Sequence, residues 1–370
     1  GPPGVGKTRL AIQVATSLLD DYGDGVYFVA LAPIGDPDFV PTSVAQTLGV
    51  NETADRSFAV RLKEYLRDKH MLLVLDNFEQ VVMAAPVVSQ LLAECPWLSI
   101  LVTSRAPLRV RRERQLPVSP LAVPAEVDAD PDLPDLMRYS AIALFVERAQ
   151  TARPGFALTP DNAGAVAAIC ARLDGLPLAI ELIAARIGVL PPQALLERLG
   201  RQLMLHTDGP RDLADRHRTL HSAIEWSYAL LAPEEQSLLA RVSVFTGGWR
   251  LEAAENVAGD GHPSTKPTAL DSLTSLVNNS LVVQQAQGGE PRFTLLETIR
   301  TYALDRLAES GKEEQARQRH AEYYLTLAET ARPHLRTGEQ QIWLDQLETE
   351  RGNLRAALTW FIERTGDAEA

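Results

Sequence analysis

Residues 1–8 read Gly-Pro-Pro-Gly-Val-Gly-Lys-Thr and match the phosphate-binding pattern G-x-x-x-x-G-K-[ST] at every fixed position. Glycines let the backbone turn tightly and point successive N–H groups at phosphate oxygens. In such a loop Lys7 would reach the β- and γ-phosphates, and the Thr8 hydroxyl would ligate Mg²⁺. The alternative is a Gly/Pro-rich turn that only caps a helix. A chance match in a chain of this length is on the order of 1%, so the stretch predicts a phosphate site.

A helix is expected directly after this loop, from Arg9 to Ala15. Its positive N-terminal end would add to phosphate binding. A phosphate-binding loop of this kind normally follows a strand, whereas the sequence starts at Gly1. We therefore expect a fragment whose sheet lacks its first strand. The apolar residues expected on one face of the helix are Leu10, Ala11, Val14 and Leu18.

Strands and helices alternate after the loop. Apolar, β-branched runs predict strands at Val26–Leu31, Met71–Leu75 and Leu98–Val102, with a last short strand near Gln115–Val118. Helical patterns lie between them at Phe39–Leu48, Arg56–Asp68 and Gln80–Glu94. This alternation predicts a parallel α/β sheet that binds its ligand at the carboxyl ends of the strands.

The strand Met71–Leu75 runs into Asp76, which is the Walker B pattern. In that pattern the carboxylate holds Mg²⁺ opposite Thr8. Taken alone the signal is weak, because many buried strands end in Asp as a turn residue. At about seventy residues after a phosphate-binding loop it becomes specific. Thr8 and Asp76 are therefore the predicted metal ligands.

The second part of the chain has a different pattern. A linker rich in proline and acidic residues is followed by helices expected at Ser140–Thr151, Asp161–Leu173, Pro177–Ile187 and Pro192–Leu199, with another helical set from about His217. Two strands around Gly288-Gly289, expected at Ser280–Gln285 and Arg292–Leu296, form a hairpin after helices, as in a winged helix. Amphipathic helices are expected at Tyr323–Ala331 and Trp343–Phe361.

Composition excludes several classes of protein. The 370 residues include 36 basic and 48 acidic ones, a net charge of −12, so the chain as a whole is no basic nucleic-acid-binding surface. Two cysteines cannot form a disulfide framework or a four-cysteine zinc site. The apolar stretches are too short for a membrane span, which needs about 20 residues. We expect a cytoplasmic protein.

Four motifs occur along the chain in this order: Gly1–Thr8, Leu72–Asn77, Thr103–Arg105 and Gly175-Leu176-Pro177-Leu178-Ala179. Together they resemble the NB-ARC branch of the STAND signal-transduction ATPases, in particular the ATPase regions predicted in bacterial LuxR-type and SARP-type transcriptional regulators. The resemblance implies an α/β P-loop domain at 1–120, a Pro-rich linker at 121–139, a small helical domain at 140–205, a winged-helix domain at 206–310 and the start of a helical, TPR-like region at 311–370.

The resemblance also assigns roles to residues. Arg105 is similar to the sensor-1 arginine that contacts the γ-phosphate, and Pro177 to the GLPL proline that packs on the adenine. Asn77 stands where fast ATPases often carry an acid, and Glu79 is the nearest carboxylate. The expected catalytic residues are Asp76, Asn77, Glu79 and Arg105. The expected nucleotide-binding residues are Gly1, Gly4, Val5, Gly6, Lys7, Thr8, Arg9 and Pro177.

One segment departs from the family pattern. Residues 295–303 align with the winged-helix MHD motif, with Leu296 in place of its histidine and Glu297 in place of its aspartate. Because leucine cannot hydrogen-bond a β-phosphate, the usual lock on ADP is expected to be altered or weaker here.

The predicted function is a slow ATPase switch that binds ATP or ADP with Mg²⁺, self-associates in the ATP state and regulates transcription through an effector region outside the fragment. Two alternatives remain: an AAA+-like DNA-processing ATPase with a DNA-contacting winged helix, and a nucleotide-dependent scaffold that does not hydrolyse. No direct nucleic-acid or membrane contact is expected. Leu270–Asn278 carries no Arg or Lys, and the basic run Arg105–Arg114 lacks interleaved aromatics.

Overall fold

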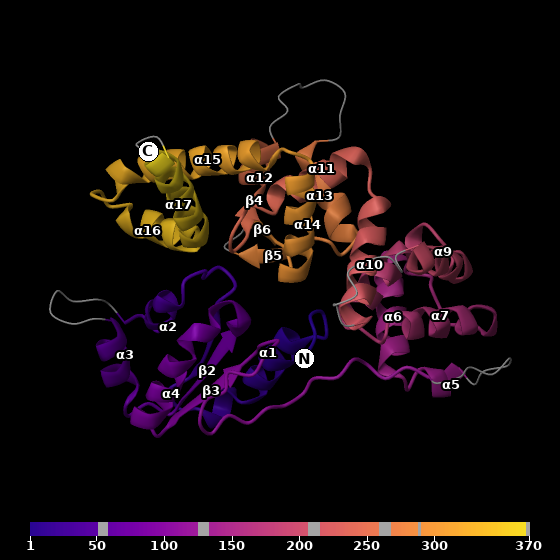
Figure 1. The fold of residues 1–370 in the computed structure, drawn as a ribbon, viewed down its shortest axis with the longest axis horizontal. Coiled ribbons are helices and arrows are strands. Elements are labelled where there is room, and N and C mark those ends of the chain that lie inside the picture. The colour runs from indigo at the N-terminus through magenta and orange to yellow at the C-terminus, as the bar shows by residue number, and fades with distance from the viewer. Residues whose placement is uncertain (51–57, 125–132, 206–214, 259–267, 288–289, 368–370) are drawn as a thin grey trace. The chain divides into compact units, whose positions relative to one another are not determined.

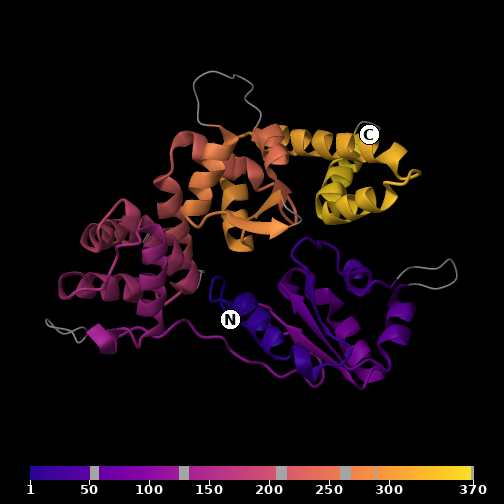
Figure 2. The same cartoon turned by 180° about the vertical axis from the view of Figure 1, so that it is seen from behind.

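The structure is a computed structural model that describes residues 1–50, 58–124, 133–205, 215–258, 268–287 and 290–367. The chain divides into two compact units, Gly1–Ser119 and Pro120–Ala370, which we describe separately. Figures 1 and 2 show the elements of each unit from opposite sides. Within the described ranges, no helix combines the length and the apolar character needed to cross a bilayer.

The first unit is built on a parallel sheet. Its strands β1 (Val26–Ala30), β2 (Met71–Asp76) and β3 (Leu98–Val102) are paired in the order β1-β2-β3. Every residue of the central strand β2 is buried. This confirms the predicted parallel α/β domain, and it brings the carboxyl ends of β2 and β3 side by side (Figure 1).

Helices cover both faces of this sheet. In chain order they are α1 (Lys7–Ser17), η1 (Leu19–Asp21), η2 (Pro37–Phe39), α2 (Val40–Thr47), α3 (Phe58–Leu66), η3 (Phe78–Ala84) and α4 (Ala85–Glu94). One face of β2, with Leu73 and Leu75, shares a core with α2, α3 and α4. The other face, with Leu72 and Val74, packs against α1.

The expected apolar face of α1 is partly wrong. Ala11 and Ala15 are buried against β2 and Leu18 is packed beside them, whereas Leu10 and Val14 are exposed. Residues spaced i, i+4 and i+7 lie on one stripe of a helix, and here the small alanines occupy that stripe. The helix therefore contacts the sheet through a narrower face than expected.

The strand expected near Gln115–Val118 is also wrong, because residues 113–120 are in neither a helix nor a strand. A strand forms only as part of a hydrogen-bonded ladder, and no described segment pairs with this stretch or with the outer edge of β3. The stretch nonetheless passes beside the loop, since a Cβ added to Gly1 would lie 2.8 Å from the Val118 carbonyl oxygen.

The second unit starts with helices. They are α5 (Leu133–Leu136), α6 (Ser140–Ala152), α7 (Pro160–Arg172), α8 (Pro177–Ala184), η4 (Ala185–Gly188), α9 (Pro192–Leu205) and α10 (Asp215–Ala229). α6 packs on α7 and α8, and α10 packs on α8. This part matches the expected helical domain.

A winged helix follows in the same unit. It comprises α11 (Pro233–Val242), β4 (Trp249–Arg250), α12 (Leu251–Ala258), α13 (Ala269–Asn278), β5 (Val283–Gln287), β6 (Glu290–Thr294) and α14 (Glu297–Glu309). Its antiparallel sheet has the order β4-β6-β5. The prediction of a winged helix from the hairpin pattern is confirmed. Gly288-Gly289, on which that pattern centred, lies outside the described residues.

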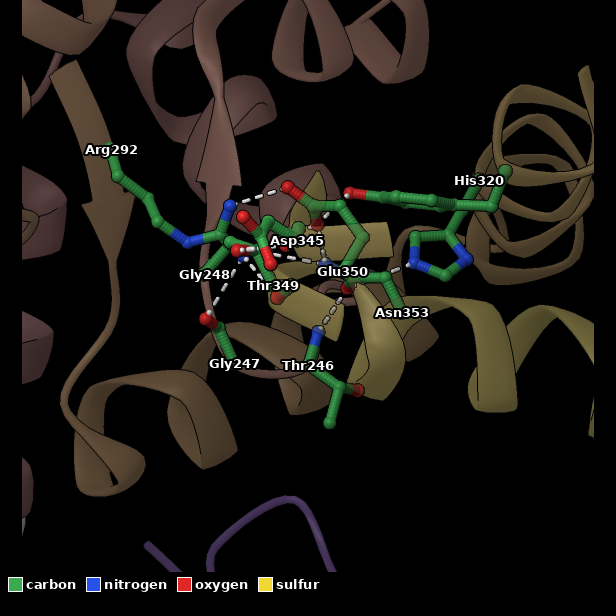
Figure 3. A network of polar contacts seen from close by, with 10 residues as sticks. Thr246, Gly247, Gly248, Arg292, His320, Asp345, Thr349, Glu350 and Asn353 are labelled. Atoms are coloured by element: carbon green, nitrogen blue, oxygen red, sulfur yellow. Dashed lines mark hydrogen bonds and ion pairs between the residues drawn. The ribbon is translucent and has the colours of Figure 1, made fainter. Parts of the chain in front are cut away.

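Three helices end the unit: α15 (Glu313–His334), α16 (Gln340–Thr349) and α17 (Arg351–Asp367). The stretch Trp343–Phe361 is helical as expected but is divided, because Glu350 separates α16 from α17 with non-helical φ −94° and ψ 8°. The Glu350 side chain is buried and bonds to Arg292 of β6 (Figure 3). The residue that separates the two helices therefore forms a long-range ion pair with the winged helix.

Arg292 connects the winged helix to these last helices (Figure 3). Its guanidinium group pairs with the Glu350 carboxylate and also donates to the carbonyl oxygens of Gly247 (3.2 Å), Gly248 (3.1 Å) and Thr349 (3.3 Å). Both charged side chains are almost completely buried. Paired and multiply hydrogen-bonded buried charges hold neighbouring elements in one arrangement.

Asn353 of α17 extends the network (Figure 3). Its side chain accepts from the Thr246 N–H at 2.7 Å and donates to the Gly248 carbonyl at 2.8 Å. His320 Nε2 lies 3.3 Å from Asn353 Oδ1, and the Tyr324 hydroxyl donates to Glu350 at 3.1 Å. The winged helix and α15–α17 therefore share one polar core.

Candidate functional site

The loop at residues 1–8 has the backbone of a phosphate cradle. Gly4 and Gly6 adopt positive φ values of 72° and 91°, which side-chain-bearing residues rarely adopt. A Cβ added to Gly6 would meet no atom within 4 Å, so the space beside this residue is open. Val5 is buried and anchors the loop. Gly6 precedes α1, whose first turn has no side-chain cap and no acidic residue, so its N–H groups suit an anion.

Lys7 places a positive charge on the loop. Its Nζ donates to the carbonyl oxygens of Gly1 and Pro2, both at 2.9 Å. Burial lowers the pKa of Lys7; the carboxylates of Glu79 and Asp76 act against this, and Arg105 acts with it. Phosphate oxygens could replace these two carbonyl oxygens as acceptors of the Lys7 hydrogen bonds.

Asp76 joins the loop to the sheet. The Thr8 hydroxyl donates to Asp76 Oδ1 at 2.7 Å, and the Thr103 hydroxyl donates to the same oxygen at 2.5 Å. Asp76 is 8% exposed and ends β2, and Thr103 follows the end of β3. The two hydroxyls fix the orientation of the carboxylate at the edge where ligands of parallel sheets bind.

Asn77 turns the chain away from the sheet. Its φ of 60° and ψ of 44° are left-handed, which Asn tolerates better than most residues. The turn is fixed by hydrogen bonds from the Asn77 N–H to Thr103 Oγ1 (3.1 Å) and from the Phe78 N–H to the Thr103 carbonyl oxygen (3.0 Å). Glu79 follows in η3 and is directed back toward the end of β3.

Glu79 and Arg105 form an ion pair at this edge. Arg105 Nε lies 2.9 Å from Glu79 Oε1, and the side chains are 40% and 17% exposed, respectively. The second carboxylate oxygen, Glu79 Oε2, is buried and has no hydrogen-bond partner in the structure. Two of the expected catalytic residues therefore contact each other.

Most of the predicted site residues come together in the first unit. The loop residues, Asp76, Asn77, Glu79 and Arg105 lie around the carboxyl ends of β2 and β3. Arg9 lies in the first turn of α1 with an exposed side chain.

Pro177 and the MHD-like segment belong to the second unit, and their nucleotide roles stay predictions. Pro177 is the first residue of α8. Gly175 before it has φ +62°, and a Cβ there would lie 2.2 Å from the Leu121 carbonyl oxygen, so packing alone requires glycine. Leu296 caps α14 with an exposed side chain, and Glu297 pairs with Arg300 at 3.5 Å.

Thr103 is the site residue to which sequence reasoning gave no role of its own. In the sequence it stands out only as part of the Thr103–Arg105 motif. The usable signal was its position: it follows β3 directly, as Asp76 ends β2, and the carboxyl ends of paired parallel strands are neighbours.

The side chains suit Mg²⁺ and a nucleotide. Mg²⁺ is usually bound through one or two carboxylates together with substrate phosphates and waters. Thr8 and Asp76 supply a hydroxyl and a carboxylate that already touch. Among the residues that the structure describes, no cluster of three or more His, Cys, Asp or Glu could hold a metal by itself. The donor set therefore fits a metal that is shared with a phosphate ligand.

Comparison with known proteins finds a matching family model and similar proteins. A family model described as "Winged helix-turn-helix domain" matches residues 231–308. The chain is 39% identical over 371 residues to the "Putative HTH-type transcriptional regulator Rv0890c" of Mycobacterium tuberculosis, which covers all of this chain and 40% of that protein. It is 34% identical over 324 residues to the "Uncharacterized protein Rv0894" of the same organism, covering 87% of this chain and 79% of that protein.

Two further proteins are similar at lower sequence identity. The "Regulatory protein AfsR" of Streptomyces griseus is 28% identical over 387 residues, covering 99% of this chain and 36% of that protein. A crystal structure of a Signal Transduction ATPase with Numerous Domains (STAND) protein with a tetratricopeptide repeat sensor, from Pyrococcus horikoshii, matches with a TM-score of 0.51 and 14% identity, over 96% of this chain and 49% of that one. The chain thus spans less than half the length of several relatives.

Proposed function

We propose that this chain, which belongs to the same family as Rv0894, is a switch operated by ATP and ADP. It has the fold of a STAND ATPase with a winged helix and is similar to putative HTH-type transcriptional regulators. The observation that carries the proposal is the hydrogen bond from Thr8 to Asp76. It joins the end of the phosphate-binding loop to the end of the Walker B strand. These are the two elements that a Mg²⁺–nucleotide needs together.

Each residue at this edge has a part in binding. The N–H groups of the loop and of the first turn of α1 hold the phosphates, and Lys7 exchanges its two carbonyl oxygens for phosphate oxygens. Thr8 and Asp76 hold Mg²⁺, with Thr103 orienting the carboxylate. Arg105 is the cation available for a γ-phosphate. Bound Mg²⁺ would neutralise charge on the phosphates during hydrolysis.

Hydrolysis is proposed to be slow. Asn77 follows the Walker B aspartate with an amide that can hold a water but cannot accept its proton. Glu79, the nearest acid, lies beyond the left-handed turn at Asn77, in η3. Slow turnover suits a switch, because the ATP state must outlast the signal it carries.

A nucleotide shifts an equilibrium only if it binds two arrangements with different affinity. We propose that ATP and ADP favour different arrangements of the domains, with boundaries at 1–120, 121–139, 140–205, 206–310 and 311–370. In this proposal the ATP state self-associates and Pro177 packs on the adenine. The chain would then be the cytoplasmic regulatory core of a transcriptional regulator whose effector lies outside residues 1–370.

The AAA+-like DNA-processing alternative is supported less well. Helix α13 contains no Arg or Lys. Arg292 of the wing is 5% exposed and bound to Glu350, so its charge does not face a DNA backbone. DNA-stimulated hydrolysis with a steep salt dependence would favour this alternative instead. A scaffold that binds nucleotide without hydrolysing it differs from the proposal only in turnover.

The experiment compares the protein with Mg²⁺–ADP and with a non-hydrolysable Mg²⁺–ATP analogue by sedimentation velocity and small-angle scattering. Two distinct states are expected, and Asp76→Asn should remove the difference between them. Asp24→Asn is the matched control, because Asp24 is paired with Lys69 at 2.8 Å away from the loop. Identical profiles for both nucleotides in the unmodified protein would contradict the switch.

A further inference from the structure

We propose that Glu79 is a positioning residue that competes with the γ-phosphate of ATP for Arg105, so that the Glu79–Arg105 pair sets the preference for ATP over ADP. The inference rests on the function proposed above. It concerns how the site distinguishes two nucleotides that share every phosphate except one.

The contact that carries the proposal is direct. Arg105 Nε lies 2.9 Å from Glu79 Oε1, and 40% of the arginine side chain remains exposed. Glu79 follows the turn at Asn77 after β2, and Arg105 follows β3. The pair is therefore built from the carboxyl ends of the same two strands that carry Asp76 and Thr103. A half-exposed guanidinium can leave one anion for another at small cost.

The pairing of Glu79 is incomplete. Its Oε2 atom is buried and has no hydrogen-bond partner in the structure. An unsatisfied buried carboxylate oxygen costs stability. The pair therefore holds Glu79 less firmly than a fully hydrogen-bonded pair would, and separating Glu79 from Arg105 costs less.

The surrounding charges favour an exchange of partners. Asp76, Glu79, Lys7 and Arg105 are close enough to perturb one another, since both carboxylates raise the pKa of Lys7 and Arg105 lowers it. An added γ-phosphate at Lys7 would repel Glu79 and attract Arg105. ADP does not bring this charge. The Glu79–Arg105 pair would therefore persist with ADP and open with ATP.

The size of the effect follows from the exposure of the pair. Partly exposed ion pairs change an equilibrium by a factor of about two to five. Removing the charge of Glu79 should therefore strengthen binding of an ATP analogue by about that factor and leave ADP binding unchanged. Removing the charge of Arg105 should abolish the preference for the ATP analogue, whichever residue stands at position 79.

The test is a fluorescence titration of labelled ADP and of a labelled, non-hydrolysable ATP analogue with Mg²⁺. The variants are Glu79→Gln, Glu79→Asp, Arg105→Gln and the double variant Glu79→Gln/Arg105→Gln. Glu94→Gln is the matched control, because Glu94 is paired with Lys63 at 2.8 Å on the same unit. Glu79→Gln should raise the ratio of the two affinities. Glu79→Asp, which keeps the charge on a shorter side chain, should raise it less, and the double variant should behave as Arg105→Gln alone.

The outcomes separate this inference from the proposed function. If the unmodified protein binds neither nucleotide, the proposed function fails and the inference fails with it. Both nucleotides could bind while the Glu79 variants change the ratio of the two affinities no more than the control Glu94→Gln does. That result would overturn only the inference. A fall in ATP-analogue affinity in both Glu79 variants would also overturn it, because Glu79 would then assist ATP binding.

Discussion

The Thr8 hydroxyl donates a 2.7 Å hydrogen bond to Asp76 Oδ1 across 68 residues of sequence. The Thr103 hydroxyl donates to the same atom, so two hydroxyls share one carboxylate oxygen. This arrangement orients the carboxylate before any ligand arrives. Preorganised groups act without the cost of rearranging at the moment of binding.

Thr103→Val should weaken this arrangement. Valine has a similar shape but removes the donor to Asp76 and the acceptor for the Asn77 N–H. Leaving these buried groups unsatisfied should cost about 1–3 kcal/mol of stability. The gain in nucleotide affinity that Mg²⁺ provides should also become smaller, because Asp76 loses the hydroxyl that orients it. Thr103→Ser keeps the hydroxyl and is the control, and equal behaviour of the two variants in urea unfolding and nucleotide titration would refute the role of Thr103.

Single-turnover hydrolysis should be much slower than the median enzyme rate of about 10 s⁻¹. The physical reason is the amide of Asn77, which can hold a water but cannot take a proton from it. Asn77→Asp should raise the rate. Rapid turnover by the unmodified protein would contradict the slow switch. Loss of hydrolysis in Glu79→Gln alone would identify Glu79 as the acid that orients water.

Arg292→Met should strongly destabilise the second unit, because it leaves the buried Glu350 carboxylate without its cation. Breaking one side of a buried ion pair costs about 3–5 kcal/mol. Adding Glu350→Gln should recover part of this loss. The control is Arg317→Met, which breaks an exposed pair with Glu313 and should cost under about 1 kcal/mol. Similar urea midpoints for the two single Arg variants would show that the buried network contributes little.

His320 should make stability depend on pH. Burial lowers the pKa of His320 from 6.5 to about 4, with Arg317 and Arg300 adding to the effect, while Asn353 and Glu350 act against it. Between these two pKa values only the unfolded chain binds the proton, so stability is complete above pH 6.5 and falls as the pH drops toward 4. The loss should reach up to about 3 kcal/mol.

The check is urea unfolding of the unmodified protein and His320→Gln between pH 4 and 7.5. Other groups titrate in this range in both proteins, so the difference between their slopes isolates His320. A shallower pH dependence is expected in the variant. Parallel curves would mean that folding does not lower the pKa of His320.

The sequence was most informative where structure depends on neighbouring residues. The glycines and Lys7 of the loop, the strands around Met71–Leu75 and Leu98–Val102, and the wing hairpin all follow from local patterns, and the structure has them. The sequence was least informative where the local structure depends on a residue far away in the chain. The expected strand at Gln115–Val118 had no ladder partner, and the helix over Trp343–Phe361 is interrupted where Glu350 meets Arg292, 58 residues away.

The candidate site shows the same limit. The Walker motifs could be found by residue type and spacing, but the contact between Glu79 and Arg105 depends on the left-handed turn at Asn77 and on the pairing of β2 with β3. No periodicity within one segment encodes such a contact. The adenine contact of Pro177 stays a prediction, because Pro177 lies in the second unit.

The central claim is that the loop at residues 1–8 binds the phosphates of ATP and ADP, and equilibrium titration of fluorescent Mg²⁺–ADP tests it most directly. Lys7→Ala removes the cation that the loop holds on two carbonyl oxygens, outside the hydrophobic core. The account predicts saturable binding by the unmodified protein and by Lys312→Ala, which changes an exposed lysine of the second unit. It predicts loss of binding in Lys7→Ala with an unchanged melting temperature. Equal affinity of Lys7→Ala and the unmodified protein for ADP would contradict the account.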